Sequence, residues 1–226
     1  MGHSGAEIGG HKLVSFAGLT LHLDTLYMTW LTMAIIIAGA ILARRGQAVV
    51  PRGWRNFIEM VIEELLAQIE ATMGPKGKQF APLIITLFLF LLIANWLGLV
   101  PGFTSPTNDI NTTFGLALLV LCLVHCLSIK NRGLIAYIKH FFQPNILFFP
   151  INVVEELAKP VTLSFRLFGN ILAGEILIII LGILVPYIVP TLWLAFSVFV
   201  GVIQALIFTM LSMSYLSGAL QDQHHE

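Results

Sequence analysis

Charged side chains are scarce in this sequence: Asp, Glu, Lys and Arg make up 11% of its 226 residues, whereas ordinary soluble domains contain about 25%. Hydrophobic residues make up 57%, so the composition excludes an ordinary soluble domain and indicates an integral membrane protein. The formal net charge is zero, which gives no sign of a nucleic-acid surface or an acidic substrate. A bilayer core about 30 Å thick takes about 20 residues per helical crossing, so the length allows about five or six crossings and no separate soluble domain.

Cysteine is also scarce. Cys122 and Cys126 lie four residues apart in one apolar run, on the same face of a helix, which argues against a disulfide framework. With His125 they form a conceivable metal-binding group, but no second cluster stands at a familiar ligand spacing, so we expect no metal and no cofactor. A Gly-x-x-x-x-Gly-Lys-Ser/Thr phosphate loop is absent as well, so we expect that the chain by itself is not an enzyme.

Long apolar runs, in contrast, are abundant. Three of them suit single crossings and two are much longer than one crossing needs, so we predict one all-α membrane domain over residues 1–226 with about five transmembrane helices. The single crossings are predicted at residues 25–43, 80–100 and 113–129, and the long helices at residues 146–185 and 191–220. Pro186 and Pro190 interrupt helical hydrogen bonding between the long runs, so we expect a long, tilted hairpin that turns at these prolines.

Residues 52–73 have a different pattern. Apolar side chains such as Phe57, Val61 and Leu65 recur at helical spacing, and acidic side chains such as Glu59 lie between them. We therefore predict an amphipathic helix that lies along the membrane surface or binds another helix. The alternative is an ordinary helix packed against its own neighbours, although a chain with so few polar residues has little soluble core to offer.

Lys and Arg are unevenly distributed along the chain. Six of them lie between the first and second predicted crossings and three follow the third, whereas the loop 101–112 and the turn 186–190 contain none. Because cytoplasmic loops carry the excess of Lys and Arg, we expect the N-terminal tail, residues 1–24, on the outer side and the C-terminus in the cytoplasm. The tail lacks the pattern of a removed signal peptide, and a short chain of this kind fits a bacterial inner membrane.

Two ionisable residues remain deep in apolar sequence, Arg166 and Glu175. An Arg at the centre of a membrane helix costs on the order of 3 kcal/mol and normally faces a polar cavity or a partner, so an intramembrane charge implies function. The alternative is a structural ion pair between the two. Their separation corresponds to about 13 Å of helical rise and places the side chains on opposite faces, so we expect no direct pair.

Three uncharged polar residues accompany these charges. Asn170 lies one turn after Arg166 on the same face, while Ser197 and Gln204 share one face of the last helix. Each alone is as well explained by a hydrogen bond between helices, but their occurrence with Arg166 favours a polar track through the hairpin. The midpoints of the two long helices bring Gln204 near Arg166 in an antiparallel pair, unless Pro160 marks the true start of its helix.

The two charged residues suit different tasks. Arginine does not release its proton in a protein, so Arg166 acts as a fixed charge rather than as a proton relay. A guanidinium that faces a membrane-buried carboxylate on a partner favours the ionised carboxylate and repels protons that would cross directly. Glu175 can accept and donate protons wherever water reaches it, so it is the candidate relay.

The strings around these residues resemble the signature of a known family. Arg166-Leu167-Phe168-Gly169-Asn170, followed by Ala173-Gly174-Glu175, is similar to the signature helix of subunit a of F-type ATP synthases. Supporting strings are Asn95-Trp96-Leu97-Gly98-Leu99-Val100-Pro101-Gly102, Pro106-Thr107-Asn108-Asp109-Ile110-Asn111-Thr112-Thr113 and Lys159-Pro160-Val161-Thr162-Leu163, with Gln204 in the last helix. The resemblance covers residues 26–220.

The resemblance implies a proton-translocating stator beside a ring of c subunits, with two offset half-channels that reach the ring from opposite sides. It also implies peripheral-stalk b subunits and the rest of the ATP synthase as partners. Arg166 matches the family's essential arginine, and residues of the outer half-channel are matched by Glu175, Asn170, Ser197 and Gln204. Some family members have a histidine in place of Ser197, which leaves open whether Ser197 relays protons or orders water.

Three further acidic residues are candidates for the same process. Glu155 and Glu156 lie near the cytoplasmic side and are assigned to the border of the inner half-channel. Asp109 is expected to cap the helix that starts near Thr112, and the alternative is that it attracts protons at the outer mouth.

Two other classes of protein compete with this interpretation. A proton-coupled secondary transporter would use Arg166 to bind an anionic substrate, but the first half of the chain has no second copy of the Arg166 segment, as transporter repeats predict. A structural scaffold that recruits partners through residues 52–73 leaves the intramembrane Arg166 unexplained. Whether the coupled ion is a proton or sodium depends largely on the ring subunit.

Overall fold

The computed structural model describes residues 13–16, 19–44, 53–100, 102–142, 145–185 and 188–221. In chain order its elements are the strands β1 (Leu13–Phe16) and β2 (Leu19–His22), followed by α1 (Leu23–Arg44), α2 (Trp54–Met73), η1 (Pro75–Phe80), α3 (Ala81–Leu97), η2 (Pro106–Asn108), α4 (Ile110–Arg132), α5 (Leu134–Phe141), η3 (Ile146–Phe148), α6 (Phe149–Leu184) and α7 (Ile188–Gln221). The η elements are short 3₁₀ helices. The chain is therefore almost entirely helical where the structure describes it.

Five helical segments are long and apolar enough to cross a bilayer, which confirms the predicted all-α membrane fold. These segments are Leu23–Ala43, Pro75–Leu97, Ile110–Arg132, Ile146–Leu184 and Ile188–Leu220. The second begins in η1 and continues through α3, and the fourth begins in η3 and continues through α6. Helix α2 and the short helix α5 are not among them, so the number of candidate crossings agrees with the sequence pattern.

The predicted N-terminal tail contains an element that the sequence analysis missed. Strands β1 and β2 pair in an antiparallel hairpin, with Leu13 opposite His22 and Phe16 opposite Leu19. Each strand has four residues, which is too short for an alternating pattern to stand out from an irregular segment. The rest of the tail up to residue 18 lies outside the described residues, and α1 already begins at Leu23.

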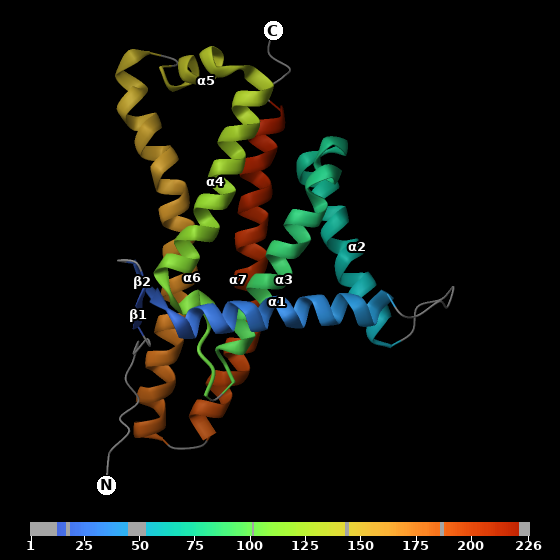
Figure 1. Cartoon of the computed structure of the whole chain (residues 1–226), viewed down its shortest axis with the longest axis vertical. Coiled ribbons are helices and arrows are strands. Elements are labelled where there is room, and N and C mark those ends of the chain that lie inside the picture. The colour runs from blue at the N-terminus through green and yellow to red at the C-terminus, as the bar shows by residue number, and fades with distance from the viewer. Residues whose placement is uncertain are drawn as a thin grey trace.

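Helices α6 and α7 form the predicted long hairpin: in Figure 1 they lie close together toward their turn, α4 lies between their other halves, and α1 crosses them at a steep angle. Helix α1 has 22 residues and is about 33 Å long, close to the thickness of a bilayer core. Helices α6 and α7 have 36 and 34 residues, about 54 and 51 Å. Helices α6 and α7 are much longer than the bilayer core is thick, so they must be strongly tilted to lie within it. Their steep angle to α1 agrees with this tilt when α1 crosses the bilayer directly.

Pro160 and Pro190 lie within helices, whereas the sequence placed Pro190 in the turn and allowed Pro160 to start a helix. Helix α7 begins at Ile188 and contains Pro190 in its first turn, where the missing backbone N–H has no helical acceptor to lose. Pro160 lies inside α6, which continues through it, so it does not mark the start of the helix. The predicted turn residues 186 and 187 lie outside the described part of the chain.

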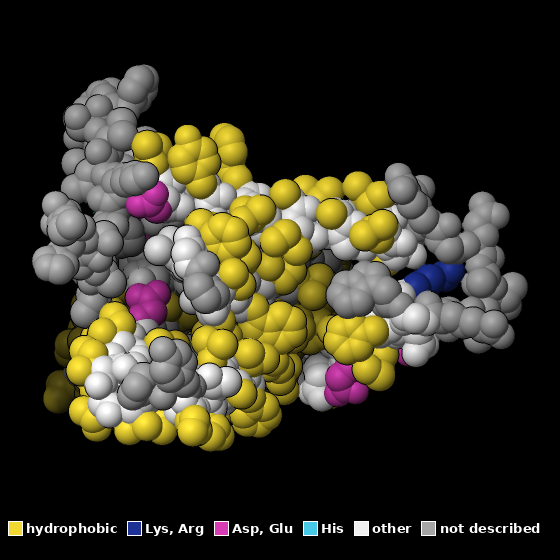
Figure 2. All heavy atoms as spheres, turned by 90° about the horizontal axis from the view of Figure 1, so that it is seen from below, with side chains coloured by type: hydrophobic (Ala, Val, Ile, Leu, Met, Phe, Trp, Pro, Cys, Tyr) yellow, Lys and Arg dark blue, Asp and Glu magenta, His cyan; other side chains and the backbone are white. Residues whose placement is uncertain are grey.

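The packed centre of the molecule is formed by α3, α4 and the second half of α7. Large side chains that are fully buried include Ile84 and Leu91 of α3, Val120 of α4 and Phe208 of α7. Helix α6, in contrast, buries few residues, and Ile183 near its end is 78% exposed. The end of the molecule that holds the α6–α7 turn is mostly hydrophobic, with isolated acidic side chains (Figure 2). Lipid or a membrane-embedded partner must therefore cover this surface.

Helix α2 combines the two alternatives that the sequence left open. In its second half Leu65, Ile69 and Met73 are buried, and the helix packs against α7, α1 and α3. In its first half Phe57 and Met60 are exposed. The amphipathic pattern thus serves packing within the protein over one half of the helix and leaves an apolar surface for lipid or a partner over the other half.

Gly98 lies so close to Ser105 that a larger side chain there is expected to lower stability. A Cβ atom at Gly98 would lie 2.7 Å from the Cβ atom of Ser105, whose position is fixed by hydrogen bonds within the protein. We expect Gly98→Ala to destabilise the folded chain by about 1–3 kcal/mol. Gly115→Ala is the matched control, since a Cβ there meets nothing within 4 Å and alanine favours a helix interior. Thermal unfolding of the detergent-solubilised protein measures both, and equal stability of the two variants contradicts the prediction.

Candidate functional site

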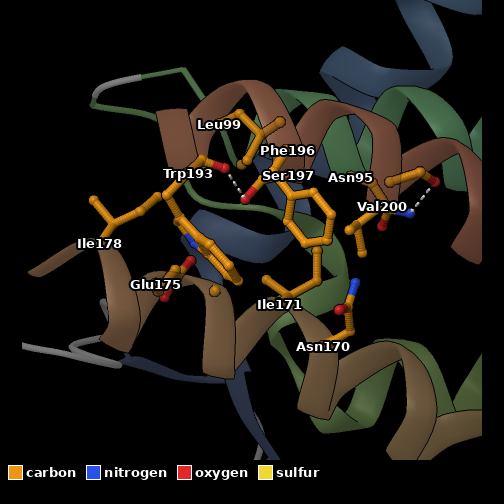
Figure 3. Close-up of a pocket in the computed structure, with 13 residues that line it drawn as sticks. Asn95, Leu99, Asn170, Ile171, Glu175, Ile178, Trp193, Phe196, Ser197 and Val200 are labelled. Atoms are coloured by element: carbon orange, nitrogen blue, oxygen red, sulfur yellow. Dashed lines mark hydrogen bonds between the residues drawn. The ribbon is translucent and has the colours of Figure 1, made fainter. Parts of the chain in front are cut away.

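A cavity of about 90 Å³ lies where α3, α6 and α7 meet. A water molecule needs about 10–15 Å³ of such space, so the cavity has room for several. It brings together three residues that the sequence analysis proposed separately: Asn170 and Glu175 from α6, and Ser197 from α7 (Figure 3). The walls between these polar groups are apolar, with Ile171, Ile178, Trp193, Phe196 and Val200 among the lining residues. The arrangement is a small polar path in an apolar surrounding.

Glu175 is held in this cavity by a residue that the sequence analysis did not pair with it. The amide of Asn108, in η2, donates a hydrogen bond from Nδ2 to Glu175 Oε2 at 2.8 Å. Asn108 Oδ1 is buried and has no hydrogen-bond partner among the described residues. A buried carbonyl oxygen of this kind requires a donor, and a water in the adjacent polar path would supply one.

Asn108 reaches Glu175 because the loop before α4 folds into the bundle. The five consecutive residues 105–109 are all buried, although most of them are polar. Ser105 Oγ donates to the Ala94 carbonyl at 2.8 Å and lies 2.7 Å from Thr107 Oγ1. Thr107 Oγ1 in turn donates to Asn95 Oδ1 at 3.2 Å. Burial of these groups is tolerated because each hydroxyl has a partner.

Two side chains of α3 fix the position of α7. Asn95 Nδ2 donates to the Gly201 carbonyl at 3.1 Å, and Trp96 Nε1 donates to the Val198 carbonyl at 3.2 Å. Both donors therefore bind backbone groups of α7 within one turn of Ser197. These two bonds hold α7 against the end of α3.

Ser197 presents its oxygen rather than its proton to the cavity. Its hydroxyl donates to the carbonyl of Trp193, one turn earlier in α7, at 2.9 Å (Figure 3). Such a bond occupies the hydroxyl proton and leaves the oxygen lone pairs as acceptors. In this geometry Ser197 is suited to accepting a hydrogen bond from water.

Arg166 lies one helical turn before Asn170 and is partly exposed. No hydrogen bond or ion pair joins it to any residue that the structure describes, so the direct pair with Glu175 is not formed. The antiparallel register of the cavity, in which Asn170 and Gly201 line one end, indicates that Gln204 stands at the level of Arg166. Gln204 is buried, and its Nε2 has no hydrogen-bond partner among the described residues.

The acidic residues at the other end of α6 are arranged differently. Glu156 Oε1 accepts a hydrogen bond from Lys159 Nζ at 2.7 Å, and Glu155 is exposed. Lys159 Nζ also lies 5.7 Å from the centre of the Tyr215 ring. Neither carboxylate lines the cavity that holds Glu175, so the structure separates two groups of acidic residues along α6.

His125 takes part in a local contact between α4 and α5. Its Nδ1 lies 2.7 Å from the hydroxyl oxygen of Tyr137. Burial, with a smaller contribution from Glu156, raises the pKa of the Tyr137 phenol, so this phenol keeps its proton near neutral pH. Cys122 and Cys126 are free and exposed, and the described residues contain no group of three or more His, Cys, Asp or Glu suited to a metal.

Asp109 caps α4, which begins at Ile110 rather than near Thr112. Its Oδ1 accepts from the backbone N–H of Asn111 at 2.9 Å, and its Oδ2 lies 2.8 Å from Nδ1 of His22, at the end of β2. The carboxylate is 6% exposed and the His22 side chain 23%. The cap and the contact to His22 together tie the start of α4 to the N-terminal hairpin.

The role of Asp109 can be tested by two substitutions. We expect Asp109→Ala to cost about 0.5–2 kcal/mol of stability because the cap is lost, whereas Asp109→Asn should cost less because Asn keeps the cap and loses only the acceptor for His22 and Thr25. Both variants are compared by thermal unfolding and by proton pumping, the activity that the resemblance implies. Normal stability combined with reduced pumping in Asp109→Asn would assign the carboxylate to the outer mouth instead of to capping.

Comparison with known proteins identifies the family. The family described as ATP synthase A chain matches residues 26–217, which is most of the chain. The chain belongs to this family. Members named "ATP synthase subunit a" include one from Acidothermus cellulolyticus, 41% identical over 97% of this chain and 84% of its own length, and one from Desulforamulus reducens, 43% identical over 92% and 84%. Another, from Moorella thermoacetica, is 40% identical over 86% of this chain and 89% of its own length.

Membership in the ATP synthase A chain family confirms the resemblance drawn from the Arg166 and Glu175 strings. It makes this chain a membrane-embedded, proton-translocating subunit of an ATP synthase and disfavours the secondary transporter. It also places the chain in a larger complex as a channel subunit. The matched region contains most of α1 and the α6–α7 hairpin up to residue 217, so the cavity lies inside it.

Proposed function

We propose that this chain is the stator that carries protons to and from a rotating ring of c subunits through two offset half-channels. The observation that carries the proposal is the fixed charge of Arg166, which has no partner among the described residues and lies one turn before Asn170, in the wall of the cavity that contains Glu175. A charge left without a partner in an apolar helix needs a partner from another subunit. A membrane-buried carboxylate on the ring is such a partner.

The cavity is the central part of the outer half-channel in this proposal. Protons from the outer side reach Glu175 beside the buried loop 105–109 and pass along Asn170 and Ser197 toward Gln204. Glu175 is the group that takes up and releases protons, and the uncharged side chains order the water between them. The buried, unpaired amide nitrogen of Gln204 supports the continuation of this water path toward Arg166.

The exposed apolar face of α6 is the surface that meets the ring. Phe165, next to Arg166, is exposed, and so is Ala173 two turns later. A ring carboxylate that arrives protonated through lipid meets the guanidinium there, which favours the ionised form and so promotes release of the proton. The membrane potential contributes about 2.3 kcal/mol per charge for each 100 mV, and this free energy drives the rotation of the ring.

The inner half-channel is assigned to the first part of α6, where Glu155 and Glu156 lie. Peripheral-stalk b subunits are the further partners, and apolar side chains exposed on α1, such as Trp30 and Ile37, offer them a membrane surface. The distribution of Lys and Arg supports an outer N-terminus and a cytoplasmic C-terminus in a bacterial inner membrane. Nucleotide chemistry belongs to other subunits, so the chain itself is a non-catalytic channel subunit.

The experiment that tests this proposal is ATP-driven proton pumping in inverted vesicles that contain the assembled complex with Arg166→Ala. Loss of pumping with normal assembly supports a stator charge at the ring. Pumping at the normal rate would reject the proposal, since no other unpaired cation stands beside the cavity among the described residues.

A further inference from the structure

The cavity contains a hydrogen-bond donor that the proton path described above does not use. The indole nitrogen of Trp193 is shielded from solvent, and it has no hydrogen-bond partner among the described residues. Trp96, the other indole beside the same helix junction, donates to the Val198 carbonyl. A buried indole N–H can only donate, and it normally finds an acceptor because an unpaired one is costly. The indole N–H of Trp193 therefore needs a hydrogen-bond acceptor inside the cavity.

The groups that line the cavity offer few suitable acceptors. Ser197 and Asn170 present neutral oxygens, whereas Glu175 presents a carboxylate, the strongest acceptor of the three. Asn108 takes one of the positions on this carboxylate, and an ionised carboxylate has room for about four donors. In Figure 3 the Trp193 ring and the Glu175 carboxyl group face the same part of the cavity. The volume allows a single water between them where the two do not touch directly.

We propose that Trp193 is a positioning residue for proton transfer at Glu175, and that its indole N–H holds the ionised carboxylate directly or through one cavity water. This inference rests on the proposed function. When Glu175 passes its proton to a cavity water, the carboxylate that remains accepts hydrogen bonds from Asn108 and from Trp193. Donors that bind the charged form favour it over the neutral form, so Trp193 eases release of the proton and keeps the carboxylate facing the water.

The other residues that line the cavity bring no second charge to this carboxylate. Glu175 is the one titratable residue among those that line the cavity. From η2 the neutral Asn108 donates to it, and the neighbouring Asp109 is in contact with His22. From α3 the neutral Asn95 lines the cavity, and on α6 the fixed charge of Arg166 lies more than two turns away. The side chains of the cavity that can donate a hydrogen bond to Glu175 are thus neutral.

Trp193→Phe tests the inference because it removes the N–H and keeps most of the apolar ring. The rate of ATP-driven proton pumping is measured against pH in inverted vesicles and divided by the amount of assembled complex. We expect a rate about 3- to 10-fold lower per complex, with the acidic limb of the pH profile moved to higher pH by about 0.5 to 1 unit. Trp193→Tyr offers an O–H donor on a smaller ring and should recover part of the rate.

Trp96→Phe is the matched control, because it also removes an indole N–H but one that binds a backbone carbonyl of α7. It should lower the yield of assembled complex and leave the pH profile unchanged. An unchanged rate and pH profile in Trp193→Phe would overturn the inference, and so would a defect confined to assembly or a Tyr variant no better than the Phe variant. Normal pumping by Glu175→Gln would reject the proposed relay itself. Loss of pumping in Glu175→Gln together with normal pumping in Trp193→Phe would reject only the role of Trp193.

Discussion

Replacing Arg166 with alanine is expected to abolish ATP-driven proton pumping while the complex still assembles. Assembly should survive because no described residue of the chain loses an ion pair or a hydrogen bond when the guanidinium is removed. Pumping should fail because the ring carboxylate then has no fixed positive charge to favour its ionised form. Loss of a single charge that stabilises a transition typically lowers a rate by about 10²–10³, so the remaining pumping should fall near the limit of detection.

The measurement uses inverted vesicles with the variant chain in the assembled complex, and passive proton leak is measured after the catalytic head is stripped. Leak should rise in Arg166→Ala, because the charge that repels directly crossing protons is gone. Arg55→Ala is a suitable control, since Arg55 pairs with Glu59 in the first half of α2 and does not line the cavity, and its loss should leave pumping normal. Unimpaired pumping by Arg166→Ala would mean that the ring carboxylate ionises without it, and the stator mechanism would have to be given up.

Replacing Glu175 with glutamine is expected to reduce proton pumping by about 10²–10⁴, the usual contribution of a positioned proton donor or acceptor. Glutamine has nearly the same shape, and its carbonyl oxygen can still accept the hydrogen bond from Asn108. The fold and the assembled complex should therefore persist. The amide does not exchange a proton at neutral pH, so the outer half-channel loses its relay.

Pumping by Glu175→Gln is compared with pumping by Glu63→Gln, which removes an exposed carboxylate on α2. The control should pump at the normal rate. Glu175→Asp should fall between the two, since it keeps an acid but shortens the reach to Asn108. If Glu175→Gln pumps as well as the control, cavity water alone carries protons past this point, and Glu175 is a structural residue.

The membrane fold could be predicted from the sequence because its causes are local and strong. Each crossing is a continuous apolar run, and lipid requires that such a run satisfy its own backbone hydrogen bonds as a helix. The length of α6 and α7 by itself requires a tilted hairpin, although Pro190, expected in its turn, lies in the first turn of α7. Short strands leave too few residues for a periodic signal, so the β1–β2 hairpin could not be predicted in this way.

The principal functional residues could also be predicted from the sequence. Arg166 and Glu175 stand out in the sequence alone, because an ionisable side chain in an apolar helix is costly wherever it points. The same is true of Asn170, Ser197 and Gln204 once the antiparallel hairpin is assumed, since their spacing fixes the face on which each lies. Sequence therefore determined the class of protein, its crossings and the principal charges of its site.

Tertiary structure alone decided how those charges are held. The hydrogen bond from Asn108 to Glu175 joins residues 67 positions apart in the sequence, and no local sequence pattern predicts a contact over such a separation. Burial of the loop 105–109 and the unpaired N–H of Trp193 likewise follow from how separate helices and a loop pack together around one cavity. Hydrogen bonds between distant segments depend on the three-dimensional path of the backbone, and that path is set by the packing of whole helices rather than by any one segment.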